Sequence, residues 1–154
     1  DVCAPTETVS ANRLDLGVDR VTPDLGAYDL VFLPGGYATR ELANDPEFVE
    51  WVETAESSKY LTSVCTGSLL LGAAGFLDGK RATTHPTAFD DLAEYAEVVD
   101  DRVVEDGTVI TGRGVSSSID LGLYVVEVLS DAETRAAIAE QMDYPYGEGV
   151  FPKS

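Results

Sequence analysis

The sequence is poor in basic residues, cysteine and histidine. Lys and Arg number 10 against 28 Asp and Glu, which gives a net charge of −18 over 154 residues. Nucleic-acid binding depends on Lys and Arg that neutralise phosphates, and docking on anionic lipid has the same requirement. The charge balance therefore argues against nucleic acid and against a membrane surface as partners.

Long apolar runs and a cysteine framework are also lacking. No run approaches the roughly 20 apolar residues of a membrane-spanning helix, and no signal-peptide pattern opens the sequence. Cys3 and Cys65 are too few for a disulfide scaffold. His85 is the single histidine, whereas ordinary zinc sites draw on several Cys and His ligands. We therefore expect a cytoplasmic protein without a metal or an organic cofactor.

The chain is expected to form one α/β domain over residues 1–154. Its 44% hydrophobic content is ordinary for a globular protein, so the acidity does not indicate disorder. Short apolar runs alternate with helix-like patterns, which predicts a mainly parallel sheet. The predicted strands are 9–21 (one or two strands), 29–33, 60–64, 81–84, 98–104 and 108–111, and the predicted helices are 45–57, 66–75, 86–95, 121–129 and 131–142.

The helix predicted at 45–57 has an acidic side. Its apolar positions are Phe48, Val49, Trp51, Val52 and Ala55, and Glu47, Glu50, Glu53 and Glu56 recur on the other side. Like charges at this spacing repel in dilute salt, and near 1 M salt the Debye length is only about 3 Å. We interpret the acidity as adaptation to a salty cytoplasm, such as that of a halophile. An acidic mesophilic surface and an acidic partner-binding face are the alternatives.

Three local signals mark turns and helix ends. Asp45 followed by Pro46 predicts a helix N-cap with proline in the first turn. Residues 105–107 (Glu-Asp-Gly) predict a hairpin turn between the strands on either side. Ser117 and Asp120 have the spacing of a capping box before an apolar helix that we expect to be buried nearly all round.

Cys65 has the sequence context of a nucleophile. By itself, a cysteine among apolar residues is most often a small core residue, and this remains the interpretation of Cys3. Cys65, however, directly follows the strand predicted at 60–64 and precedes a helix of small residues at 66–75. A sharp strand-to-helix turn projects its side chain above the carboxyl edge of the sheet. The helix N-terminus behind it favours the thiolate.

Two glycines and a histidine follow other strands at the same predicted edge. The amides of Gly35 and Gly36, together with the amide of Thr66, form a candidate oxyanion hole, although Pro-Gly-Gly is also an ordinary turn. His85 follows the strand predicted at 81–84, and histidine is the side chain most often used for general acid–base work. A lone histidine is more often structural, and both interpretations remain open.

Four segments resemble the PfpI/ThiJ superfamily, which is related to class I glutamine amidotransferases. They are DLVFLPGG at 29–36, SVCTGSLLLGAAG at 63–75, ATTHP at 82–86 and TGRGVSSSIDLGL at 111–123. The Cys-Thr pair and IAEQMDYPY at 138–146 resemble the isocyanide-hydratase branch. The resemblance covers nearly the whole chain, with the motifs in the family's order.

The resemblance implies a flavodoxin-like three-layer sandwich with a mainly parallel sheet. It also implies that Cys65 is the nucleophile, that Gly36 and Thr66 offer backbone N–H groups to a small-molecule substrate, and that His85 is a partner base. Members are usually homodimers with the active site near the subunit interface. Their activities include isocyanide hydration, glyoxalase-type hydration and amide or peptide hydrolysis, besides chaperone and redox-sensor roles.

The resemblance is incomplete at the N-terminus. Family members begin with a further strand and helix, which carry an Asp or Glu that hydrogen-bonds the cysteine sulfur. The sequence from Asp1 corresponds to the part of the family pattern after that strand and helix, so we expect a domain that lacks both. No acid of this sequence is assigned as a substitute.

These features lead to one main hypothesis and two alternatives. The main hypothesis is a cysteine-dependent hydratase or hydrolase, in which the Cys65 thiolate adds to an electrophilic carbon of an isocyanide- or glyoxal-type substrate. The first alternative is a redox-sensing or protein-protective module whose thiol is oxidised. The second is a metabolite-binding regulatory domain without turnover.

Overall fold

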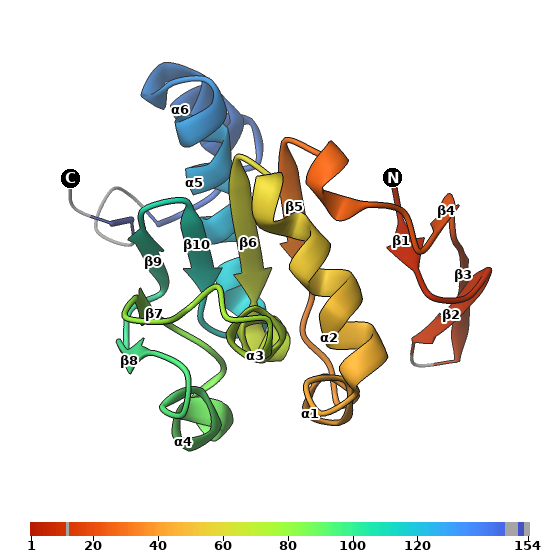
Figure 1. Cartoon of the computed structure of the whole chain (residues 1–154). Helices are drawn as coiled ribbons and strands as arrows, with labels where there is room; N and C mark the ends of the chain where they lie inside the picture. The colour runs from red at the N-terminus through yellow and green to blue at the C-terminus, as the bar shows by residue number, and fades with distance from the viewer. Residues whose placement is uncertain (12, 147–150, 153–154) are drawn as a thin grey trace.

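The molecule is built on a four-stranded sheet with the strand order β5-β6-β10-β9. The computed structural model describes residues 1–11, 13–146 and 151–152. β5 (Leu30–Leu33), β6 (Tyr60–Val64) and β10 (Val109–Gly112) are parallel, and β9 (Val103–Asp106) is antiparallel to β10. The carboxyl ends of β5, β6 and β10 therefore lie at one edge, as Figure 1 shows.

Helices cover both faces of this sheet, which makes three layers (Figure 1). One face carries α1 (Thr39–Leu42), α2 (Pro46–Glu53), α3 (Ser68–Ala73) and α4 (Phe89–Leu92). The other carries α5 (Ser118–Leu129), against which α6 (Ala132–Gln141) packs. Short 3-10 helices lie at Leu25–Ala27, Thr54–Ser57, Cys65–Gly67, Pro86–Ala88 and Val115–Ser117. The predicted flavodoxin-like α/β architecture is confirmed.

Each face of the sheet has its own apolar core. Leu61 and Val109 pack with α2 and α3 in the larger core, where Leu71 and Leu77 are almost fully buried. Ile110 and Val64 pack with residues of α5 in the smaller core. Alternate residues of β6 and β10 thus serve opposite cores, as the period of two in a strand requires.

Among the described residues, three two-stranded pairs lie outside the main sheet. β2 (Thr8–Ala11) and β3 (Leu14–Gly17) form an antiparallel hairpin, which extends away from the body in Figure 1. β1 (Cys3–Ala4) pairs with β4 (Arg20–Val21), and β7 (Arg81–Ala82) pairs with β8 (Glu97–Val98); both pairs are parallel. Residues 9–21 therefore contain parts of three strands rather than the one or two predicted.

The strand predictions at 29–33 and 60–64 are confirmed, but the single strand predicted at 98–104 is wrong. Its first residue ends β8, which pairs with β7, and β9 begins only at Val103. The hairpin between β9 and β10 is confirmed, with Gly107 in the turn at φ +66°, although Glu105 and Asp106 belong to the strand. The local sequence pattern contains no information about the pairing of β8 with β7, which are separated in the chain.

Each predicted helix is present, although α5 begins at Ser118 rather than Leu121, and the errors at α5 concern its capping and its burial. Asp45 caps α2 through its carboxylate, with Pro46 in the first turn, as predicted. The capping box at α5 is wrong, because Ser117 makes no side-chain cap and Asp120 faces the interior. The predicted helix 121–129 is also not buried all round, since Leu129 is 55% exposed.

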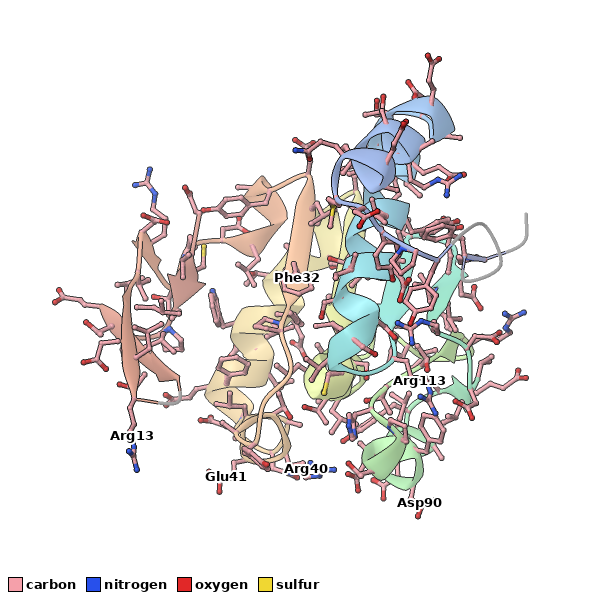
Figure 2. The ribbon with its side chains drawn as sticks, turned by 180° about the vertical axis from the view of Figure 1, so that it is seen from behind. Arg13, Phe32, Arg40, Glu41, Asp90 and Arg113 are labelled. Atoms are coloured by element: carbon pink, nitrogen blue, oxygen red, sulfur yellow. The ribbon has the colours of Figure 1, made fainter. Side chains whose placement is uncertain are left out.

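β5 forms one edge of the described sheet. Its one partner among the described strands is β6, and Phe32 is 48% exposed. Figure 2 views the face that carries α5, and Phe32 stands on it without a covering helix. Among the described residues, no helix is both long and apolar enough to cross a bilayer.

Candidate active site

Cys65 occupies a sharp turn between β6 and α3. Its backbone has φ +56°, in the left-handed region that non-glycine residues rarely adopt. Such a conformation costs on the order of 1–3 kcal/mol and persists only where the surrounding structure enforces it. The thiol is free and half-buried. The predicted strand–cysteine–helix turn is therefore present, at the carboxyl edge of the sheet.

Two glycines make room for this turn. A Cβ atom on Gly67 would lie 2.1 Å from the carbonyl oxygen of Leu33, so only glycine fits where the helix crosses the end of β5. A Cβ on Gly35 would lie 2.7 Å from Cβ and 3.0 Å from Sγ of Cys65. Gly35 therefore leaves open the space directly beside the sulfur.

Hydroxyl groups hold the backbone of the turn. The Cys65 carbonyl oxygen accepts hydrogen bonds from Thr84 Oγ1 at 2.9 Å and from Ser68 Oγ at 3.2 Å. Thr84 is fully buried and directly precedes His85. This contact therefore fixes the segment that carries His85 against the cysteine turn.

The residues of the predicted oxyanion hole lie together. The amide of Gly36 donates to Oγ1 of Thr66 at 3.1 Å, and this hydroxyl lies 3.1 Å from the Gly36 carbonyl oxygen, to which it donates. The Thr66 amide nitrogen would lie 3.0 Å from a Cβ on Gly35, so it borders the space beside the sulfur. The Gly36 amide has to leave Thr66 before it can bind a ligand. Oxyanion binding by Gly35, Gly36 and Thr66 stays a prediction.

His85 is engaged in a turn of its own. Its Nδ1 accepts a hydrogen bond from the Thr87 amide at 3.3 Å and lies 2.9 Å from Thr87 Oγ1. Nε2 is therefore the ring nitrogen left for chemistry. Cδ2 would lie 3.5 Å from a Cβ on Gly114, which places the ring beside the segment after β10. Within the described residues His85 and Cys65 share no hydrogen bond, and the role of partner base stays a prediction.

The buried carboxylate of this region is one that sequence reasoning assigned to a helix cap. Asp120 is fully buried and binds Arg102, whose Nε donates to Oδ2 at 2.8 Å, and Tyr144, whose hydroxyl donates to Oδ1. Burial and the Asp120 carboxylate raise the pKa of Tyr144 to about 12. Among the described side chains, no carboxylate hydrogen-bonds the sulfur of Cys65. The spacing of Ser117 and Asp120 fits a helix cap, and nothing in the sequence around them indicates that Asp120 is buried and bound to Arg102 instead.

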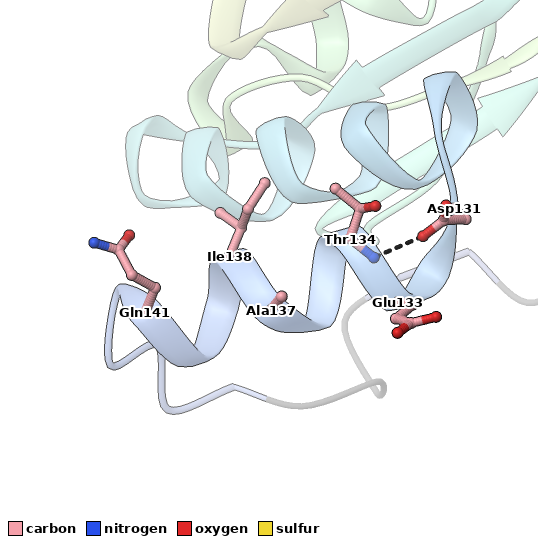
Figure 3. A pocket seen from close by; sticks show the side chains of 6 residues that line it. All are labelled: Asp131, Glu133, Thr134, Ala137, Ile138 and Gln141. Atoms are coloured by element: carbon pink, nitrogen blue, oxygen red, sulfur yellow. Dashed lines mark hydrogen bonds between the residues drawn. The ribbon is translucent and has the colours of Figure 1, made fainter.

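Two cavities among the described residues lie away from the cysteine. One of about 500 Å³ runs along α6, as Figure 3 shows, and is lined by Asp131, Glu133, Thr134, Ala137, Ile138 and Gln141. Another of about 230 Å³ lies between α1 and α4 beside Arg40 and Asp91. Neither is lined by Cys65 or His85. In the described parts of the chain, no group of three or more His, Cys, Asp or Glu side chains is arranged to hold a metal ion.

Fold and site together define a flavodoxin-like α/β protein with a cysteine at a strained strand-to-helix turn. The sequence profile of the DJ-1/PfpI family matches residues 6–128. The chain belongs to the DJ-1/PfpI family, which confirms the resemblance found in its motifs.

The chain is similar to relatives whose names state different activities. The chain is 38% identical over 137 residues to isonitrile hydratase of Pseudomonas putida, an alignment that covers 88% of this chain and 60% of the relative. It is 30% identical over 123 residues to the glutathione-independent glyoxalase DJR-1.2 of Caenorhabditis elegans, covering 74% and 66% of the two chains. The structure of a ThiJ/PfpI family protein from Pseudomonas syringae matches with a TM-score of 0.84 at 32% identity, over 99% of this chain and 65% of that one. The chain thus spans less than two thirds of the length of the first of these relatives and of the solved structure.

Proposed function

We propose that the chain is a cysteine-dependent hydratase or hydrolase of small electrophilic molecules, with Cys65 as the nucleophile. The observation that carries the proposal is the left-handed backbone of Cys65 beside Gly35. Strain of this kind is concentrated at functional sites, and here it aims the thiol into space that glycine keeps open. The similarity to an isonitrile hydratase and to a glyoxalase supports the same class of chemistry.

For an isocyanide substrate, the proposed reaction consumes one water and yields a formamide. The Cys65 thiolate forms a bond to the terminal carbon, which takes a proton and becomes a thioimidate. Water then adds to that carbon, the carbon–sulfur bond breaks, and the electron pair returns to sulfur. Proton transfer to nitrogen completes an N-substituted formamide. No oxidant, reductant or metal enters this balance.

The neighbouring groups have distinct roles in this proposal. The Thr66 amide would stabilise negative charge that develops beside Cys65, because its nitrogen borders the space over Gly35. Gly36 would add its amide after releasing the Thr66 hydroxyl. His85 would move protons through Nε2, since Nδ1 is held at Thr87.

The direct test is turnover by the purified chain with a panel of isocyanides, methylglyoxal and simple amides. Wild type is expected to convert at least one class, and Cys65→Ala is expected to abolish conversion with the melting temperature retained. Cys3→Ala is the matched control, because Cys3 lies in β1, outside the site, and it is expected to keep full activity. Conversion that survives in Cys65→Ala would exclude the mechanism.

A sensing role for the same thiol is the second candidate, and it is favoured by a free Cys65 thiol beside the space that Gly35 leaves open. Mild peroxide would then add oxygen to Cys65 in preference to Cys3. Mass spectrometry of peptides after such treatment distinguishes the two. A chain that turns over no substrate but gains oxygen selectively at Cys65 fits the sensor. A chain that binds metabolites and does neither fits a regulatory domain.

We also propose that the chain acts as a homodimer in the cytoplasm. Both cysteines are free, which suits a reducing compartment. The hairpin β2–β3 exposes Leu14 by 61% and Leu16 by 44%, with Val9 opposite Leu16. An isolated two-stranded hairpin is marginal in water, so covering this apolar side with a second copy would stabilise it. Light scattering of wild type and Leu16→Glu tests this, with a monomer expected for the variant alone.

A further inference from the structure

Asp120 is a fully buried carboxylate whose two oxygens are held by two distant segments. Arg102, which precedes β9, binds Oδ2 through Nε at 2.8 Å and also through Nη2. Tyr144, which follows α6, donates its hydroxyl to Oδ1. Together these three residues form what we call the Asp120 anchor.

Stability alone does not explain this arrangement. Removing the Asp120 charge fully and the Arg102 charge partly from water offsets much of their attraction, and apolar residues of similar volume often serve as well or better. A buried pair with several hydrogen bonds does, however, fix geometry, because each partner accepts only a narrow range of positions. The anchor therefore has to be judged by what it positions.

Arg102 positions the segment that follows β10. Its Nη2 donates to the carbonyl oxygen of Ser116 at 3.1 Å, and its own carbonyl oxygen accepts from the Arg113 amide at 3.0 Å. Arg102 thus holds both ends of the segment 113–116, which includes Gly114. The ion pair with Asp120 sets the direction in which the guanidinium points.

This segment borders the candidate active site. It begins after Gly112, which pairs with Val64, the residue directly before Cys65. A Cβ on Gly114 would lie 3.5 Å from Cδ2 of His85. The segment 113–116 therefore forms the wall of the site on the α5 side, opposite Gly35.

We propose that Asp120, acting through Arg102, is a positioning residue that fixes the wall 113–116 against Cys65 and His85. The anchor reaches substrate only through this wall, so none of its members is a catalytic residue. The inference deepens the proposed function and rests on it.

The first test compares Asp120→Asn with Tyr124→Phe. Asp120→Asn keeps the shape but removes the charge that orients Arg102. A misplacement of about 1 Å at a reacting group can reduce rates about 100-fold, so we expect kcat/KM to fall about 10- to 100-fold, mainly through kcat. Tyr124→Phe removes another buried hydrogen bond of α5, the one to Glu105, which has no link to the wall. It is expected to keep the wild-type kcat/KM.

A second variant separates positioning from folding. Asp120→Leu combined with Arg102→Met replaces the ion pair by apolar side chains, and its melting temperature is expected to stay near that of wild type. Ser116 still loses its donor, so the loss of kcat/KM is expected to persist. A folded double variant with wild-type kinetics would overturn the proposal.

A third readout does not depend on turnover. In a Cys3→Ala background, the ratio of the rates at which iodoacetamide and N-ethylmaleimide alkylate the remaining thiol reports how tightly the wall encloses Cys65. Both Asp120 variants are expected to change this ratio, and Tyr124→Phe is expected to leave it unchanged. If wild type turns over no compound, the proposed function fails while this ratio still decides the role of Asp120. Equal ratios in all variants would overturn it.

Discussion

The two sides of the Cys65 turn are held in place by different forces. On the β5 side, Gly35 and Gly67 fit because any side chain there would meet backbone or the cysteine itself. On the α5 side, Asp120 and Arg102 hold the wall through charge and hydrogen bonds. On the β5 side no larger residue fits in place of these glycines, and this steric restriction does not depend on pH or salt. Polar anchoring depends in addition on the charge state of Asp120 and on the hydrogen-bond partners that remain.

The largest effect is expected from volume on the β5 side. Gly67→Ala places Cβ 2.1 Å from a backbone oxygen that has no room to move, so we expect a loss of more than about 3 kcal/mol in the free energy of unfolding, or no folded protein. Urea unfolding followed by circular dichroism measures it. Gly122→Ala is the control, because a Cβ there meets no atom within 4 Å on the exposed side of α5. This control is expected to gain about 0.5–1 kcal/mol from helix propensity. Equal stabilities of the two variants would remove the steric half of the comparison.

Gly35→Ala is expected to act on the thiol as well as on the fold. Its Cβ would lie 3.0 Å from Sγ of Cys65, which can rotate away, but also 2.7 Å from Cβ of Cys65 and 3.0 Å from the Thr66 amide nitrogen, which move only with the backbone. We expect alkylation of Cys65 to slow by at least about tenfold, because the new methyl group fills the path of attack. The melting temperature should fall less than in Gly67→Ala. Unchanged alkylation would mean that reagents approach the sulfur from another side.

The difference between the two sides also explains what could be predicted from sequence. The turn at Cys65 and the strands before it could be predicted, because they depend on short motifs of glycine and cysteine. The steric requirements of these motifs involve residues that are close in the sequence. The Asp120 anchor joins residues 18 and 24 positions apart, and nothing in their spacing marks them as partners. The cap that His85 provides to the Thr87 amide is local and had a signal, since a side chain before Pro86 can accept from the next turn. The pairing of β8 with β7, by contrast, depends on tertiary contacts alone.

The polar side is expected to respond to alkaline pH. Burial and Asp120 raise the pKa of Tyr144 from 10.0 to about 12, so the folded state keeps this proton longer than the unfolded state. Below pH 10 both states are protonated and the stability is complete. Between pH 10 and 12 the unfolded state loses its proton first, and the free energy of unfolding falls. Urea unfolding across this window is expected to show a shallower decline in Tyr144→Phe than in wild type. Part of the decline remains, because burial and Glu105 also raise the pKa of Tyr124. Identical declines would show that Tyr144 does not titrate within the anchor.

The smallest effect on stability per residue is expected from salt. The salt dependence of the melting temperature distinguishes the exposed surface charges from the buried Asp120 anchor. We propose that the net charge of −18 reflects adaptation to high salt; all four glutamates of the acidic helix side, Glu47, Glu50, Glu53 and Glu56, are exposed. Each like-charged pair on a helix costs about 0.2–0.5 kcal/mol in dilute salt, and this repulsion is screened as KCl rises. The melting temperature is therefore expected to rise with KCl, and less steeply in Glu50→Gln.

The Asp120–Arg102 pair gives the matched contrast, because Asp120 is fully buried and ions screen it weakly. The difference in melting temperature between wild type and Asp120→Asn is therefore expected to stay constant as KCl rises. A wild-type protein that is most stable without salt would contradict the adaptation. If this difference in melting temperature shrinks as KCl rises, salt screens the Asp120 anchor as it screens surface charges. The contrast between a buried anchor and an exposed acidic surface would then be wrong.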